Sequence, residues 1–316
     1  MTLSEVGLGC WQFGGDWGPM SEDKALEIMQ TAVDSGTTFF DTADVYGAGR
    51  SESFIGEFLK KTAADIRVVT KFGREAEVYP DQYTEAALRA GIQRSCQRLG
   101  VEALDLVQLH CIPTAVMQEG TIFDWLRSAQ ADGLIKHFGA SVETVDEALL
   151  CMQQDGLASL QIIFNIFRQK PIQALLPQAK SKGVGIIVRL PIASGLLAGK
   201  FTRDSTFAKE DHRTYNRDGQ CFNVGETFAG LPFDKGVELA DQIKAWVPEG
   251  MAMAQMAMRW ILDFDAVSVV IPGASSPQQA LDNARASDLP PLSEELHQKL
   301  ATFYTQEVHD HIRGPY

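Results

Sequence analysis

The chain has 316 residues, of which 45% are hydrophobic and 22% charged, and this balance excludes general disorder. Its formal charge of -13 repels nucleic-acid phosphates and anionic lipid surfaces, so neither nucleic acid nor a membrane is an expected partner. The first residues hold no cationic stretch before an apolar run, and no segment reaches the roughly 18 apolar residues of a transmembrane helix, which predicts a cytoplasmic protein.

Eight short runs of apolar, β-branched or aromatic residues predict strands along the chain. They are residues 6–11, 38–41, 68–72, 104–110, 135–141, 160–165, 185–190 and 268–272. Most of these runs lack polar alternation, which is typical of parallel strands covered on both faces. The segments between them are long enough to hold crossover helices.

The intervening segments carry helix signals. Ser21 precedes an apolar stripe that ends at Gly36, Thr84 and Gly100 bound a second helix, and residues 121–131 and 144–152 have the same character. Strands that alternate with helices predict an α/β fold, the (β/α)₈ or TIM barrel, as a single domain over residues 1–316. An open doubly wound sheet is the alternative, disfavoured because no G-x-G-x-x-G motif follows the first strand.

Two segments depart from this pattern. Residues 201–231, after the seventh predicted strand, are irregular and rich in Gly, Asp, Arg and aromatic residues, which indicates a lid or binding loop or else a mobile surface excursion. The C-terminal helix and its tail, residues 306–316, either close over the site or trail on the surface.

Three consecutive predicted strands end in polar residues that belong at one rim of a barrel. Asp41 ends the second strand and Tyr46 follows it, Lys71 ends the third, and His110 ends the fourth. Each alone is more often structural, but a lysine at the end of an apolar strand needs a carboxylate such as Asp41. We expect Lys71 to lower the pKa of Tyr46 and His110 to orient a carbonyl, an arrangement that suits proton delivery to a carbonyl oxygen without a metal ion.

The motifs around these residues are similar to those of the aldo-keto reductases, and the resemblance covers nearly the whole chain. It is carried by GLGCW at 7–11, DTADVYG at 41–47, TK at 70–71, QLH at 108–110 and IPGAS at 271–275. The resemblance implies a (β/α)₈ barrel that moves a hydride between a nicotinamide cofactor and an aldehyde, ketone or sugar carbonyl. It also implies that Tyr46 is the general acid and base, with Asp41, Lys71 and His110 completing its tetrad.

The same resemblance implies a set of cofactor residues. Ser141, followed here by Val142 where the family often has Asn or Arg, and Gln161 correspond to contacts of the nicotinamide carboxamide. Arg189 takes the place of an aromatic residue that stacks on the nicotinamide, with an ordinary ion pair as its alternative. The other implied contacts are Trp11, Pro191, Ile192, Ser194, Gly195, Leu196, Lys200, Gly273, Ser275, Gln279 and Asn283.

NADP(H) is favoured over NAD(H) as the cofactor. No Lys or Arg stands near Gly273, but Lys200 with Arg203 or Arg213 offers positive charge from the long loop. The polar character of Asp16 in the expected pocket indicates a hydroxylated carbonyl as the small-molecule substrate. The five cysteines form no C-x-x-C pair, so neither disulfides nor a zinc site is predicted.

Two other hypotheses remain beside the reductase. The first is a regulatory subunit that holds the cofactor with slow turnover, as channel β subunits in the same family are thought to do. The second keeps the barrel but makes Lys71 the Schiff-base lysine of an aldolase. The spacing of Tyr46 and Asp41 and the cofactor turns argue against the aldolase.

Overall fold

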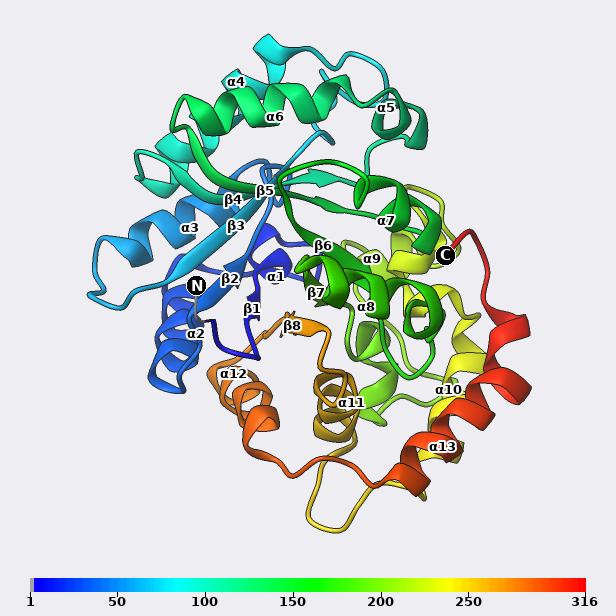
Figure 1. Ribbon diagram of the computed structural model, residues 1–316. Helices are drawn as coiled ribbons and strands as arrows, with labels where there is room; N and C mark the ends of the chain where they lie inside the picture. The colour runs from blue at the N-terminus through cyan, green and yellow to red at the C-terminus, as the bar shows by residue number, and fades with distance from the viewer. Residues whose placement is uncertain (1–2) are drawn as a thin grey trace.

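The computed structural model describes residues 3–316, so Met1 and Thr2, the first residues of the predicted domain, lie outside the described residues. Eight parallel strands form one sheet in chain order at the centre of the molecule (Figure 1). They are β1 (Leu8–Gly9), β2 (Phe39–Asp41), β3 (Arg67–Phe72), β4 (Leu104–His110), β5 (Ile135–Ser141), β6 (Leu157–Ile163), β7 (Gly185–Arg189) and β8 (Val267–Val270).

The sheet closes into a barrel between its first and last strands. The backbone N–H of Gly7 donates to Val270 O at 2.8 Å, and that of Gly9 donates to Pro272 O at 3.0 Å. Parallel bridges join Val6 to Val270 and Gly9 to Gly273. The (β/α)₈ barrel predicted from the sequence is therefore confirmed.

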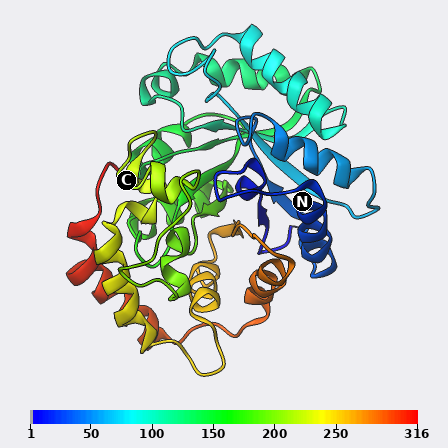
Figure 2. The same ribbon diagram turned by 180° about the vertical axis from the view of Figure 1, so that it is seen from behind.

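The main helices surround the barrel, as both views show (Figures 1 and 2). They are α2 (Glu22–Asp34), α3 (Arg50–Leu59), α4 (Glu85–Leu99), α5 (Thr114–Glu119), α6 (Thr121–Ala131), α7 (Val145–Cys151), α8 (Pro171–Lys182), α10 (Phe233–Lys244), α11 (Met253–Leu262), α12 (Pro277–Ala284) and α13 (Glu294–Phe303). Ser21 and Thr84 accept hydrogen bonds from backbone N–H groups at the starts of α2 and α4, as their positions predict. The apolar faces of these helices pack on the outside of the sheet and form the main core. None of the helices within residues 3–316 is long and apolar enough to span a membrane.

Some predicted strand ends were wrong. The first strand stops at Gly9, because the chain turns at Cys10 into the short helix α1 (Trp11–Gly14), so Trp11 lies on a helix and not on a strand. β6 begins three residues earlier than predicted, at Leu157, and β8 ends at Val270, before Pro272. Hydrogen-bonded pairing with the neighbouring strands decides where each strand begins and ends, and an apolar run in the sequence does not show where that pairing stops.

The long segment after β7 is ordered by short helices. It contains α9 (His212–Tyr215), the 3₁₀ turns η2 (Val224–Glu226) and η3 (Phe228–Gly230), and follows the turn η1 (Ala193–Ala198). Asp211 caps α9, and the backbone N–H of His212 donates to Asp16 O at 2.9 Å, which ties the segment to the loop after β1.

The C-terminal tail docks on this segment, next to α9, in both views (Figures 1 and 2). The Arg313 guanidinium donates to Gly230 O at 3.0 Å and to Leu231 O at 3.2 Å. The Tyr316 ring lies 4.4 Å from the Arg168 guanidinium. The tail therefore does not trail on the surface, and it supports the long segment over the carboxyl ends of the strands.

Candidate active site

The four residues predicted for the tetrad meet at the carboxyl ends of β2, β3 and β4. Lys71 Nζ donates to Asp41 Oδ1 at 2.6 Å and to the backbone oxygen of Thr42 at 2.8 Å. Lys71 Nζ also lies 3.4 Å from the Tyr46 hydroxyl. The ring of His110 stands edge-on to the Tyr46 ring, with centroids 5.9 Å apart.

The pKa of Tyr46 moves in the opposite direction to the one predicted. Burial raises it well above its usual value of 10, and the carboxylates of Asp41 and Glu226 raise it further. These effects outweigh the guanidinium of Arg189, which lowers the pKa of Tyr46. Burial and the cations Lys71 and Arg74 hold the pKa of His110 well below 6.5, so its imidazole is neutral.

An amide network fixes Asp41 from its second side. Gln161 Nε2 donates to Asp41 Oδ2 at 2.6 Å and to Gln108 Oε1 at 2.9 Å. Ser141 Oγ donates to Gln161 Oε1 at 3.5 Å. Both oxygens of the buried Asp41 carboxylate are thereby occupied, which holds Lys71 toward Tyr46.

Most of the predicted cofactor residues line one cavity of about 550 Å³ beside this cluster. They are Trp11, Gln161, Arg189, Pro191, Ile192, Ser194, Gly195, Lys200, Gly273, Ser275, Gln279 and Asn283. The two exceptions, Ser141 and Leu196, are buried with about 1% of each residue exposed. Trp11 belongs to this wall through α1 and not through a strand.

This cavity fits an extended anionic cofactor. Lys200, Arg213 and Arg189 line it, and within residues 3–316 Trp17 Nε1 and Arg189 Nε are buried donors without a hydrogen-bond partner. Gly273 and Gln12 lie together in the wall of this cavity, and only a glycine fits at 273 because a Cβ there would meet the Gln12 side chain. Unpaired buried donors are costly, so their presence here indicates a bound acceptor.

A second cavity, of about 810 Å³, opens on the other side of the tetrad. Tyr46, Trp11 and Glu226 line both cavities, and His110 and Cys111 line the second one. His110 Nδ1 has no partner among the described residues. The Tyr46 ring therefore borders the space on either side of the cluster.

Comparison with known proteins identifies the family. The aldo/keto reductase family profile matches residues 5–304. This chain belongs to the aldo/keto reductase family. An aldo-keto reductase of Bacillus subtilis, YhdN, is 28% identical to it over 88% of this chain and 83% of the relative. The solved structure of the glycerol dehydrogenase AKR11B4 from Gluconobacter oxydans is 26% identical, with a TM-score of 0.78, and the match covers 99% of this chain and 95% of that one.

A relative with a different kind of name matches over a similar length. A protein of Oryza sativa subsp. japonica that is named a probable voltage-gated potassium channel subunit beta is 26% identical over 92% of this chain and 90% of its own length. The resemblance drawn from the sequence motifs is thus confirmed at the level of the family.

Three charged residues of this aldo/keto reductase were missed by the sequence analysis. Glu226 Oε2 lies 2.5 Å from Arg189 Nη1, so Arg189 forms the ion pair named as its alternative role while it also lines the cofactor cavity. Arg74 Nη2 lies 3.3 Å from Glu143 Oε1. Glu143 stands two residues beyond β5, so a search of the residues that follow each predicted strand could have found it. Glu226 lies in the long segment, where no periodic sequence pattern indicates which residues face the site.

Proposed function

We propose that the chain is an NAD(P)H-dependent oxidoreductase that reduces an aldehyde, ketone or sugar carbonyl, with Tyr46 as the general acid. The observation that carries this proposal is the position of Tyr46. Its hydroxyl lies 3.4 Å from the Lys71 ammonium, and its side chain lines both the cavity that fits the cofactor and the cavity left for a substrate.

The chain's own groups then divide the proton chemistry. The cofactor, when bound, supplies the hydride. Tyr46 gives its hydroxyl proton to the carbonyl oxygen, and the Lys71 ammonium stabilises the phenolate that remains. Asp41 holds that ammonium at 2.6 Å, and the neutral His110 donates an N–H to the same carbonyl oxygen.

NADP(H) is the preferred cofactor in this proposal. Lys200 and Arg213 line the same cavity as Gly273, Ser275 and Gln279, so positive charge from the long segment lies on the cofactor side of the barrel. Such charge favours a nucleotide that carries an additional phosphate. Titration of the protein with NADPH and NADH, followed by fluorescence, measures the preference directly.

The role of Tyr46 is tested by Tyr46→Phe. We expect kcat for a carbonyl substrate to fall by about 10²–10⁴-fold, the usual contribution of a general acid, while the dissociation constant of NADPH changes little. Tyr83→Phe is the matched control, because the Tyr83 hydroxyl donates to Gly73 O at 2.9 Å, and neither cavity includes Tyr83 in its wall. A Tyr46→Phe enzyme with nearly wild-type kcat would remove Tyr46 from the mechanism.

A cofactor-holding regulatory subunit is the second candidate, favoured by the rice relative named a channel β subunit. That role predicts tight cofactor retention with turnover far below the usual 1–10³ s⁻¹ of enzymes. Steady-state NADPH consumption with a panel of aldehydes distinguishes the two functions. The aldolase alternative is disfavoured because Lys71 Nζ is engaged in a buried ion pair with Asp41 Oδ1 at 2.6 Å, whereas a Schiff-base lysine needs its amine free to attack a carbonyl.

A further inference from the structure

Glu52 is a buried charged residue that the proposed mechanism does not use. It lies in the first turn of α3, outside the barrel, and is 0% exposed. Its two carboxylate oxygens bind different elements: Arg98 Nε of α4 donates to Oε2 at 2.5 Å, and Thr70 Oγ1 of β3 donates to Oε1 at 2.5 Å. Glu52 therefore joins α3 not only to a neighbouring helix but also to a strand of the barrel.

The strand residue that Glu52 holds is the one before Lys71. Successive side chains of a strand point to opposite faces, so Thr70 points outward to α3 while Lys71 points into the barrel. There Lys71 Nζ donates to Asp41 Oδ1 at 2.6 Å. The hydrogen bond between Thr70 and Glu52 thus fixes the part of β3 from which the Lys71 side chain extends.

Ser51, the residue before Glu52, makes a similar contact to the end of β2. Thr42 Oγ1 donates to Ser51 Oγ at 2.8 Å, and both residues are fully buried. Thr42 follows Asp41, and its backbone oxygen accepts a hydrogen bond from Lys71 Nζ at 2.8 Å. The backbone N–H of Ser51 also donates to Tyr46 O at 3.2 Å. The start of α3 therefore contacts the chain next to three members of the tetrad.

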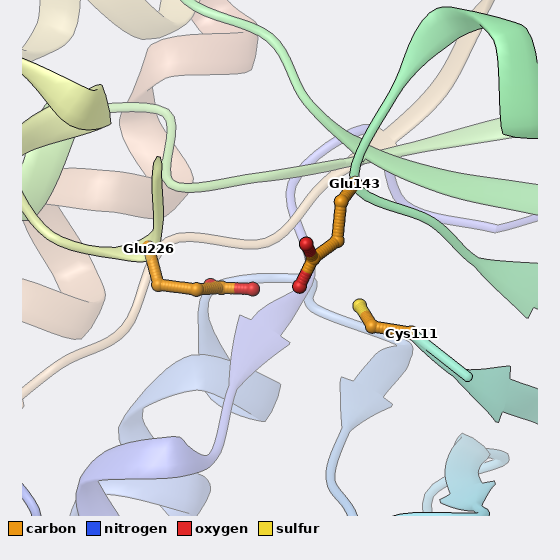
Figure 3. Close-up of side chains that lie close together, drawn as sticks. All are labelled: Cys111, Glu143 and Glu226. Carbon is orange, nitrogen blue, oxygen red and sulfur yellow. The ribbon is translucent and has the colours of Figure 1, made fainter. Parts of the chain in front are cut away.

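The charged groups on the cavity side of the tetrad do not hold Lys71 in this way. Figure 3 shows the side chains of Cys111, Glu143 and Glu226 directed toward one another, with one ligand atom from each within 4.8 Å of the others. Both carboxylates pair with guanidinium groups, at 2.5 and 3.3 Å. Within residues 3–316 neither carboxylate accepts a hydrogen bond from Lys71, so this cluster does not fix the ammonium.

We propose that Glu52 is a positioning residue of the tetrad, which holds Lys71 in place through Thr70. Ser51 supports the neighbouring strand in the same way. This inference rests on the proposed reductase function and adds two residues to its machinery. Neither side chain lines the cofactor cavity or the substrate cavity, so both act only through the 3.4 Å distance between Lys71 Nζ and the Tyr46 hydroxyl.

The first test removes the hydroxyl that Glu52 accepts. Thr70→Val keeps the shape of the side chain, but the buried carboxylate loses a donor and no longer holds the strand. With benzaldehyde as the substrate, a displacement of Lys71 Nζ by about 0.5 Å should lower kcat about tenfold, while KM for benzaldehyde and the dissociation constant of NADPH change less than about twofold. Thr70→Ser keeps the hydroxyl and should retain at least about half of the wild-type kcat.

A matched control shows whether any lost threonine hydrogen bond slows the reaction. The Thr38 hydroxyl accepts from the Ser4 backbone N–H at 2.9 Å just before β2, at the opposite end of the barrel. Thr38→Val should lose stability without losing kcat. An equal loss of kcat in Thr38→Val and Thr70→Val, or no rescue by Thr70→Ser, would overturn the positioning role.

The solvent deuterium isotope effect on kcat distinguishes positioning from a merely structural role. A displaced Lys71 slows proton transfer from Tyr46, so the isotope effect should rise in Thr70→Val. A smaller fraction of folded protein would lower kcat and leave the isotope effect unchanged, which would contradict the inference. Ser51→Ala leaves Glu52 and Thr70 intact and serves as the second variant if Thr70→Val folds poorly: a wild-type kcat and isotope effect in Ser51→Ala would then overturn the inference.

A structural measurement separates this inference from the proposed reaction. Crystal structures of the wild type, Thr70→Val and Thr70→Ser with NADP⁺ give the distance from Lys71 Nζ to Tyr46 Oη without any turnover. This distance should grow by about 0.5 Å in Thr70→Val and stay unchanged in Thr70→Ser. A displaced ammonium in a protein that reduces no carbonyl compound would support the positioning by Glu52 and refute the reductase. An unchanged distance in Thr70→Val would overturn the inference and leave the reductase untouched.

Discussion

Substitutions in the buried ion pair between Lys71 and Asp41 can separate its effect on stability from its effect on the proposed reaction. Lys71 Nζ lies 2.6 Å from Asp41 Oδ1, and the two side chains are only 1% and 4% exposed. Lys71→Met keeps the length of the side chain but removes its charge. Asp41 then retains the Gln161 amide at 2.6 Å as its remaining side-chain donor and becomes an uncompensated buried carboxylate.

The expected cost of Lys71→Met is about 3–5 kcal/mol, the usual penalty for breaking a buried pair from one side. The double variant Asp41→Asn/Lys71→Met also removes the orphaned charge, so it should recover to within about 2 kcal/mol of wild type. Both variants should lose carbonyl reduction, because each lacks the ammonium beside Tyr46. Stability and activity would therefore respond differently to the second substitution.

Thermal unfolding followed by circular dichroism at neutral pH measures these differences. In a chain of this length 1 kcal/mol corresponds to about 1.5 °C in Tm, so Lys71→Met should melt about 5–8 °C lower than wild type. Lys60→Met is the matched control, because the exposed pair of Lys60 with Glu57 at 2.7 Å should contribute less than about 1 kcal/mol. A Tm loss below 2 °C in Lys71→Met, or no recovery in the double variant, would refute the reasoning.

Two further predictions concern stability. A Cβ at Gly56 would lie 2.1 Å from the backbone oxygen of Arg98, so Gly56→Ala should force α3 and α4 apart and lower Tm by about 3–5 °C. The control Glu57→Ala, on the same helix, should change Tm by less than about 1.5 °C. Equal Tm values for the two variants would contradict this contact. Burial lowers the pKa of His212 from 6.5 to about 4 in the folded protein. As the pH falls from 6.5 to 4, the histidine is therefore protonated in the unfolded chain before it is protonated in the folded one. The free energy of unfolding should fall over this pH range by up to about 3 kcal/mol. Tm measured at pH 7.5 and 4.5 should therefore fall less in His212→Phe than in wild type, and parallel losses would exclude His212 as the cause.

The fold could be predicted because its elements carry local signals. β4 and β5 begin and end at the predicted residues, and the capping groups of Ser21 and Thr84 start helices where the apolar stripes begin. The predictions failed where partners distant in sequence decide the structure. The first strand pairs with β2 only at Leu8 and Gly9 before the chain turns into α1, and the short helix α9 is stabilised by Asp16, which precedes it by almost 200 residues.

In the candidate site, too, local sequence signals predict which residues meet but not how their charges act on one another. The barrel order places Asp41, Lys71 and His110 at one rim, so their proximity follows from strand ends alone. The strength of Tyr46 as an acid does not follow from these strand ends, because it also depends on burial and on Glu226, which lies in the long segment after β7. A raised pKa keeps the proton on Tyr46 over the neutral range, which is the state that a carbonyl reductase needs before reaction. In the reaction that we propose, Tyr46 releases that proton when the carbonyl oxygen becomes strongly basic during reduction, and the ammonium at 3.4 Å then stabilises the phenolate.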